Sequence, residues 1–248
     1  MKCVDLKYRG KKSLGGGGCS VASLFLEALT YFFYLPTSRM ELYPISLQYR
    51  RFPEPFRPPM TKQTKAIPRM GVIVAVDSKF GIGKNGTLPW TLRKDMKFFA
   101  ECTSTTVDPT KTNAVIMGRK CWESIPEKFR PLKNRLNIVI SRTLPNRREK
   151  DLIVTDDFDG ILKELMSGEL SERVEKVWNI GGAEIYKLGL ESGLVSELVI
   201  TKIQKDVGAD VFLSGIDWEN FEEDESARSE PMTENGTEFT FHRYRCVK

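Results

Sequence analysis

The feature that most constrains the fold is a series of short, mostly apolar runs that begins just after Met70. The run at 71–76 contains no polar residue, so a strand formed from it is apolar on both faces and must be covered on both. Similar runs recur at 113–117, 136–140, 152–154, 177–180 and 198–203. Strands of this kind are typical of a central sheet with helices on either side.

Helical patterns lie between these runs, so the chain alternates strands with helices. They cover 92–102, 119–124, 157–166 and 183–190. Near the end, residues 237–247 alternate roughly between aromatic and polar side chains, as an antiparallel edge or hairpin strand does. The acidic segment 218–230 is expected to be a solvated loop. The sequence therefore predicts an α/β fold with a mostly parallel sheet and an antiparallel C-terminal part.

Composition divides the chain near Met70. Residues 1–69 carry 12 Lys and Arg against 4 Asp and Glu and hold 7 of the 13 prolines, whereas the remainder carries 26 basic and 29 acidic residues. We therefore expect residues 1–69 to be a basic, Pro-rich, disordered extension without a catalytic role, before one folded domain over 70–248. The alternative is a mitochondrial presequence. The apolar stretch 21–35 contains Glu27 and is too short for a comfortable membrane span.

The rest of the composition excludes several classes of function. Since the folded part carries a slight negative charge, no basic groove for nucleic acid is expected. The five cysteines are odd in number and widely spaced, and the one histidine, His242, lies in a strand-like segment. Neither a disulfide framework nor a metal site is therefore expected, and a reducing, cytoplasmic compartment fits.

One acidic residue, Asp95, occupies a position where a helix should be apolar. Thr91 is predicted to be the N-cap of a helix that begins at Leu92, and Leu92, Met96 and Phe99 then form one face that includes Asp95. Burial would raise the pKa of this carboxyl, while the helix N-terminus would favour its anion. Such a carboxylate can bind a hydrogen-bond-donating heterocycle and move a proton. The alternative is that Asp95 bonds local amides or turns to water.

Loops at the ends of the predicted strands are the other candidate binding elements. The GxGxxG at 81–86 would need a helix at its third glycine to bind a dinucleotide, but Leu-Pro-Trp follows at 88–90. A glycine-hinged loop over a site is therefore the better interpretation. Glycines and cations follow other strands at 118–120, 141–142 and 181–182. Their backbone N–H groups and charges suit the phosphates of a ligand.

Taken together, these motifs resemble those of the dihydrofolate reductase family. The resemblance runs from about 71 to 248 and is carried by segments at 71–76, 81–90, 115–126, 130–135, 139–142 and 178–186. It implies NADPH-dependent reduction of 7,8-dihydrofolate to tetrahydrofolate, for one-carbon metabolism, by a monomer. It also implies a central, mostly parallel, eight-stranded sheet with an antiparallel C-terminal strand and flanking helices.

The resemblance assigns roles to individual residues. Asp95 would hold the pterin ring and promote protonation of its N5 before a hydride reaches C6, with Leu88, Trp90 and Thr201 completing the catalytic set. The substrate would be lined by Ile73, Val74, Ala75, Asp95, Met96, Phe99, Ile125, Leu132, Arg135, Ile180 and Thr201. NADPH would be bound by Ala75, Ile82, Gly86, Gly118, Arg119, Lys120, Cys121, Ser141, Arg142, Ile180, Gly181, Gly182, Ile185 and Tyr186. A cis peptide is implied between Gly181 and Gly182.

Cys121 departs from the family, which commonly has Thr at this position. A thiol is the weaker hydrogen-bond donor. At a helix N-terminus between cations, the pKa of Cys121 is expected to be lowered, so that the thiol is reactive unless NADPH covers it. Two other functions remain open, namely a non-catalytic protein that keeps both pockets and a pyrimidine reductase of riboflavin synthesis. The first leaves Asp95 unexplained and the second leaves Arg135 unexplained.

Overall fold

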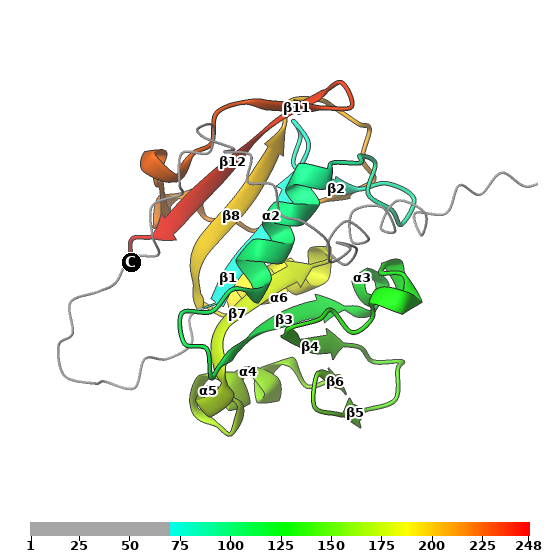
Figure 1. Cartoon of the computed structure of the whole chain (residues 1–248), viewed down its shortest axis with the longest axis vertical. Helices are drawn as coiled ribbons and strands as arrows, with labels where there is room; N and C mark the ends of the chain where they lie inside the picture. The colour runs from blue at the N-terminus through cyan, green and yellow to red at the C-terminus, as the bar shows by residue number, and fades with distance from the viewer. Residues whose placement is uncertain (1–69) are drawn as a thin grey trace, which may run out of the picture.

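The computed structural model of this chain describes residues 70–248 (Figure 1). The expectations for residues 1–69, a disordered extension or a presequence, fall outside the described residues. Within 70–248, no helix has the length and apolar character needed to cross a membrane. That same range contains no cluster of His, Cys, Asp and Glu side chains that could hold a metal ion.

A ten-stranded sheet forms the centre of the described domain. Its mutually parallel strands are β1 (Met70–Val76), β3 (Thr112–Gly118), β4 (Arg135–Ile140), β6 (Leu152–Thr155), β7 (Val174–Gly181) and β8 (Val195–Ile203). The antiparallel strands are β5 (Arg147–Arg148), β10 (Phe221–Glu223), β11 (Met232–Glu234) and β12 (Thr237–Cys246). The order is β10-β12-β8-β1-β7-β3-β4-β6-β5, with β11 paired to β12, and a separate small sheet joins β2 (Gly81–Gly83) to β9 (Val211–Phe212).

Helices cover both faces of this sheet. They are α2 (Arg93–Ser104), α3 (Arg119–Ser124), α4 (Phe158–Ser167), α5 (Leu170–Arg173) and α6 (Ala183–Glu191), with 3-10 turns η1 (Glu127–Phe129), η2 (Trp218–Asn220) and η3 (Glu225–Ala227). Figure 1 shows α2 lying across one face. Ile73 of β1 packs on that side, in one core with Phe98 and Phe99, whereas its neighbours Val72 and Val74 pack in a second core with α4 and α6. Alternate residues of β1 thus serve opposite cores, as the continuous apolar run predicted.

The structure confirms the mixed architecture and corrects its edges. The sheet has ten strands where eight were expected, and three of the ten, β5, β10 and β11, are only two or three residues long. The acidic segment 218–230 is not simply a loop, since it contains η2, β10 and η3. Phe221 pairs with Cys246 of β12 and packs against the core, and this pairing orders the segment. The short helix α5 was also not predicted.

The predicted start of α2 is wrong by one residue. Leu92, not Thr91, is the N-cap, with an extended backbone and no capping bond from its own side chain. The cap comes instead from Glu234 of β11, which accepts hydrogen bonds from the backbone N–H groups of Arg93 at 2.8 Å and Lys94 at 3.0 Å. Leu92 is buried beside Phe241 and therefore fixes where the helix can begin. Asp95 is consequently the third residue of the helix rather than the fourth.

We predict that residues 70–248 fold when they are produced alone. Met70 is fully buried and pairs with both β7 and β8, and each apolar core is complete within the described range. The melting temperature of this fragment is expected within about 4 °C of that of the full chain, which corresponds to roughly 1 kcal/mol. Thermal unfolding of both proteins by circular dichroism tests this. A fragment that is insoluble while the full chain is soluble would contradict the prediction.

Candidate active site

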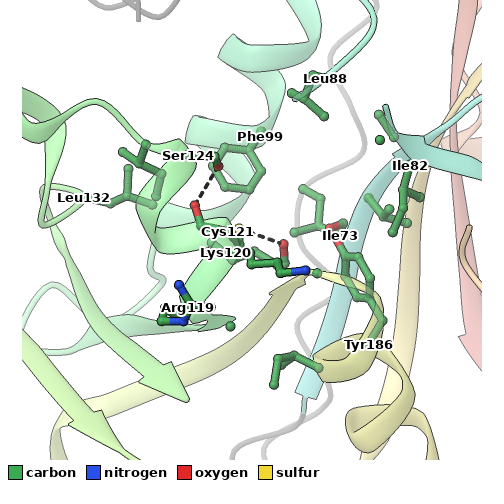
Figure 2. A pocket seen from close by; sticks show the side chains of 18 of the residues that line it. Ile73, Ile82, Leu88, Phe99, Arg119, Lys120, Cys121, Ser124, Leu132 and Tyr186 are labelled. Atoms are coloured by element: carbon green, nitrogen blue, oxygen red, sulfur yellow. Dashed lines mark hydrogen bonds between the residues drawn. The ribbon is translucent and has the colours of Figure 1, made fainter. Parts of the chain in front are cut away.

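A cavity of about 1980 Å³ opens where α2, α3 and the start of α6 meet the carboxyl ends of the parallel strands. Figure 2 shows Phe99 and Leu132 on one side of it, Ile73, Ile82 and Tyr186 on the other, and Arg119, Lys120 and Cys121 between them. Ligands of open α/β sheets bind at this edge of the sheet, because strand order and loops leave a crevice there. The cavity is therefore the candidate site.

Most of the residues predicted for the site line this cavity. They are Ile73, Val74, Ala75, Ile82, Gly86, Leu88, Asp95, Met96, Phe99, Gly118, Arg119, Lys120, Cys121, Ile125, Leu132, Arg135, Ser141, Arg142, Ile180, Gly182, Ile185 and Tyr186. Trp90, Gly181 and Thr201 are not part of its wall. Sequence reasoning missed lining residues of η1, Lys128 and Phe129, because a 3-10 turn has no periodic signal.

Asp95 is buried in the cavity wall, with 8% of its surface exposed. Its Oδ1 accepts a 2.6 Å hydrogen bond from the hydroxyl of Thr201, a buried residue of β8. Burial raises the pKa of Asp95 to about 6, which outweighs the lowering by the Thr201 bond, and the nearby charge of Glu234 raises it further. An Asp95 turned out to water is excluded by this burial. The carboxyl is therefore poised to change its protonation state near neutral pH.

Arg135 is a buried cation in the cavity wall. Its Nη1 donates to Thr103 Oγ1 at 2.7 Å and its Nε donates to the carbonyl of Lys133 at 2.9 Å, while none of the ion pairs between described residues includes it. Burial lowers the pKa of this guanidinium to about 10. A buried charge without a counter-charge is costly, so an anionic ligand group is the natural partner of Arg135.

Asn137 of β4 holds the loop that presents Arg135. Its side chain accepts from the N–H of Leu132 at 2.9 Å and donates to the carbonyls of Leu132 at 2.9 Å and Arg135 at 3.0 Å. Because Asn137 is fully buried, these bonds satisfy its polar atoms and fix the loop against the strand. The positions of both Leu132 and Arg135 therefore depend on one amide.

A second group of cations lies around α3 and the end of β4. Arg142 is exposed, and Arg119 is paired with Glu123 one helical turn away at 2.7 Å. An exposed pair of this spacing is worth only about 0.3–0.5 kcal/mol, so a phosphate could displace Glu123. The Ser141 side chain forms hydrogen bonds within its own loop, because its Oγ accepts from the backbone N–H groups of Thr143 and Leu144.

Two glycines, Gly181 and Gly182, lie at the end of β7, where the backbone carries no side chain. The peptide between Gly181 and Gly182 is cis, as the family resemblance implied. Gly181 has φ +90°, and an added Cβ would lie 2.4 Å from the ring of Tyr186, so no other residue fits there. An added Cβ at Gly182 would meet nothing within 4 Å, which leaves this backbone open to a ligand.

The expectation that the pKa of Cys121 is lowered is wrong. Burial raises the pKa of its thiol to about 12 instead of lowering it. Cys121 packs against the core on the α2 side, and its Sγ lies 3.7 Å from the carbonyl oxygen of Ile180. An apolar surrounding disfavours the thiolate more than a short helix favours it, so Cys121 should resist thiol reagents with or without a ligand.

The glycine loop is held over the cavity by a second loop and does not open a helix. β2 pairs with β9, and the N–H of Asn85 donates to Asp210 Oδ2 at 2.7 Å. The N–H of Asp210 in turn donates to the carbonyl of Gly83 at 3.0 Å. Since no helix begins between Gly86 and Arg93, the dinucleotide interpretation of 81–86 is excluded and the loop interpretation is supported.

Comparisons with known proteins give matches over the described domain. The dihydrofolate reductase family model matches residues 69–246. A Caenorhabditis elegans relative named for the same family is 46% identical over 185 residues, or 73% of this chain and 98% of the relative. The Gallus gallus dihydrofolate reductase is 40% identical over 69% of this chain and 93% of that protein. The solved Schistosoma mansoni dihydrofolate reductase is 37% identical, with a TM-score of 0.64, covering 73% of this chain and 100% of that chain.

We predict that Asp95→Asn stabilises the fold at neutral pH. The pKa of Asp95 is raised from 3.8 to about 6, so native stability is lost as pH rises through that window, by about 3 kcal/mol at 1.36 kcal/mol per unit. Asn carries no charge to bury, so the variant should be up to about 3 kcal/mol more stable at pH 7.5 and equal to wild type below pH 4. Urea unfolding of both proteins at the two pH values measures this. A stability difference that does not change with pH would contradict it.

Proposed function

Because this chain belongs to the dihydrofolate reductase family, we propose that the cavity beside α2 is where it reduces 7,8-dihydrofolate to tetrahydrofolate, with NADPH as hydride donor. The family establishes the enzyme class, the substrate and a nicotinamide cofactor. The choice of NADPH and the role of each residue are our proposal.

The observation that carries the proposal is the buried, hydroxyl-bonded carboxyl of Asp95 in the cavity wall. The pterin ring presents N–H donors to a carboxylate, and its N5 must be protonated before C6 can accept a hydride. A carboxyl whose pKa is about 6 is present in both protonation states near neutral pH. Asp95 can therefore bind the ring and favour its protonated form. Thr201 holds the carboxyl in one orientation.

Leu88 and Trp90 are proposed to close the site beside the acid. Leu88 lies on the loop at the mouth of the cavity (Figure 2), where its side chain can exclude water from the reacting ring. The indole N–H of Trp90 is buried and has no hydrogen-bond partner among the described residues. A buried donor of this kind costs free energy unless a ligand group or a bound water accepts its hydrogen bond. Because Trp90 lies outside the cavity wall, a bound water between this donor and the substrate is the acceptor that we propose.

The rest of the substrate fits other residues of the cavity wall. Phe99, Ile125 and Leu132 offer apolar surface to an aminobenzoyl ring, and all three line the cavity. Arg135, which lacks a carboxylate partner among the described residues, suits the carboxylate of the glutamate that follows this ring. The order from Asp95 through Phe99 to Arg135 thus matches the order of groups in the substrate.

The residues on the α3 side fit a phosphorylated dinucleotide. When it is bound, NADPH supplies the hydride. An added Cβ at Gly118 would lie 3.1 Å from Ile185, and Gly182 is open, so backbone from two strand ends can approach the cofactor closely. Arg142 and Lys120 are exposed at the same edge of the cavity. A guanidinium forms charge-assisted hydrogen bonds with a 2′-phosphate that it cannot form with a ribose hydroxyl.

The test of the proposed acid is the pH dependence of hydride transfer in Asp95→Asn. The variant keeps the shape of the side chain but cannot favour a protonated pterin, so its rate should be much reduced at neutral pH and should rise as pH falls. Pre-steady-state hydride transfer, measured across pH for wild type and variant, checks this. Asp159→Asn, an exposed change outside the cavity, is the control. An Asp95→Asn enzyme as fast as wild type at pH 7 would refute the role of Asp95.

For the cofactor, we predict that Arg142→Ala selectively weakens the binding of NADPH. Loss of a charge-assisted hydrogen bond costs about 1.5–3 kcal/mol, or roughly ten- to a hundredfold in affinity. Affinity for NADH should hardly change. Binding constants for both cofactors measure the effect, and Arg147→Ala, which removes an exposed arginine outside the cavity wall, is the matched control. Equal losses for both cofactors would show that Arg142 is structural.

A further inference from the structure

The β11–β12 hairpin reaches across to the start of α2. Its two-residue turn, Asn235-Gly236, has positive φ at both positions, 52° and 71°, which is the geometry of a type I′ turn. Beside this turn, Glu234 accepts hydrogen bonds from the backbone N–H groups of Arg93 and Lys94, one on each carboxylate oxygen. The amide of Asn235 donates to the carbonyl of Thr91 at 3.0 Å. The hairpin therefore holds both Thr91 and the first turn of α2.

These contacts join α2 to the same part of the sheet that holds the acid. The first N–H groups of a helix have no partner within it, so a carboxylate that bonds two of them fixes its N-terminus. β11 pairs with β12, and Phe241 of β12 lies opposite Thr201 of β8. Asp95 of α2 bonds to that same Thr201. Glu234 and Thr201 thus connect one helical turn to two strands, β11 and β8, that both pair with β12.

We propose that Glu234 is a positioning residue for the active-site acid, holding the first turn of α2 so that Asp95 stays in the cavity wall and bonded to Thr201. The inference rests on the role proposed above for Asp95. A carboxylate from the other end of the domain caps the helix, because the side chain of the N-cap residue, Leu92, makes no capping hydrogen bond. Arg93 and Lys94 are exposed, which leaves room beside their backbone for the carboxylate of Glu234.

The position of Glu234 also acts on the charge of Asp95. The charge of Glu234 raises the pKa of Asp95, and its carboxylate occupies two of the amides that would otherwise stabilise the Asp95 anion. Two other titratable groups interact with Asp95, namely Cys102 of α2 and Tyr186 of α6. Burial raises the pKa of the first to about 11 and that of the second well above 10, so both are neutral at neutral pH. Glu234 is therefore the charge to change.

The experiment is a titration of Asp95 by carbon-13 NMR of the aspartate carboxyl groups, in the ligand-free full chain, with the signal assigned by its loss in Asp95→Asn. Glu234→Gln keeps the shape and one acceptor but removes the charge. We expect its Asp95 midpoint about half a unit below that of wild type, a threefold change in the ionisation constant. The control is Glu238→Gln, which removes an equal charge from an exposed residue of the same hairpin and should leave the midpoint unchanged.

Two outcomes overturn the proposal. One is an Asp95 midpoint in Glu234→Gln that coincides with wild type, and the other is an equal shift in Glu238→Gln. If Glu234→Gln does not fold, Glu234→Asp, which keeps the charge on a shorter side chain, is titrated instead. Its Asp95 midpoint should lie below that of wild type, and a midpoint equal to wild type overturns the proposal. The titration needs no substrate. It therefore remains valid if Asp95→Asn transfers hydride at the wild-type rate, a result that would refute the proposed role of Asp95 alone.

Discussion

The hydrogen bond between Asp95 and Thr201 is the interaction on which the rest of this site depends. It joins the first turn of α2 to β8 and holds an ionisable group where apolar side chains would normally pack. Burial there makes the anion costly, as the raised pKa of Asp95 shows. The native state is therefore less stable at neutral pH than it would be with an uncharged residue here, and in return a carboxyl with a pKa near 6 faces the cavity. This exchange of stability for a reactive group is typical of active sites.

The sheet supplies the stiffness that such a group needs. β1 and β8 lie side by side near the middle of the sheet, and their neighbours β7 and β12 protect them from the edges. Ile73 of β1 forms part of the cavity wall, and Tyr186 donates to its carbonyl at 3.0 Å, which ties α6 to the same strand. A substrate ring bound against β1 thus meets backbone that is fixed from both faces. The glycine loop beside the cavity is held by the short β2–β9 pairing and by the hydrogen bonds between Asp210 and residues Gly83 and Asn85.

The two arginines Arg135 and Arg119, which both line the cavity, differ in how far they are buried and in whether they have an ionic partner. Arg135 is buried without a carboxylate partner among the described residues, so an anionic ligand group would complete its environment. Arg119 is partly exposed and already forms an ion pair with Glu123. A ligand anion at Arg135 therefore relieves a desolvation cost, but one at Arg119 only exchanges partners. These two environments suit a single carboxylate at one end and several phosphate oxygens at the other.

The sequence alone determined the alternation of strands and helices, the two-sided burial of β1 and the place of Asp95 in an apolar stripe, because these follow from local periodicity. Tertiary structure decided the features that depend on residues far apart in the chain, namely the cap of α2 and the burial of Cys121. Leu92 replaces Thr91 as the N-cap because its burial beside Phe241 fixes the start of the helix, and Glu234 of β11 supplies the capping carboxylate. The expected pKa of Cys121 was reversed because its thiol turns into the core rather than toward the cations. Capping partners and desolvation depend on contacts between residues far apart in the chain, and no local pattern encodes them.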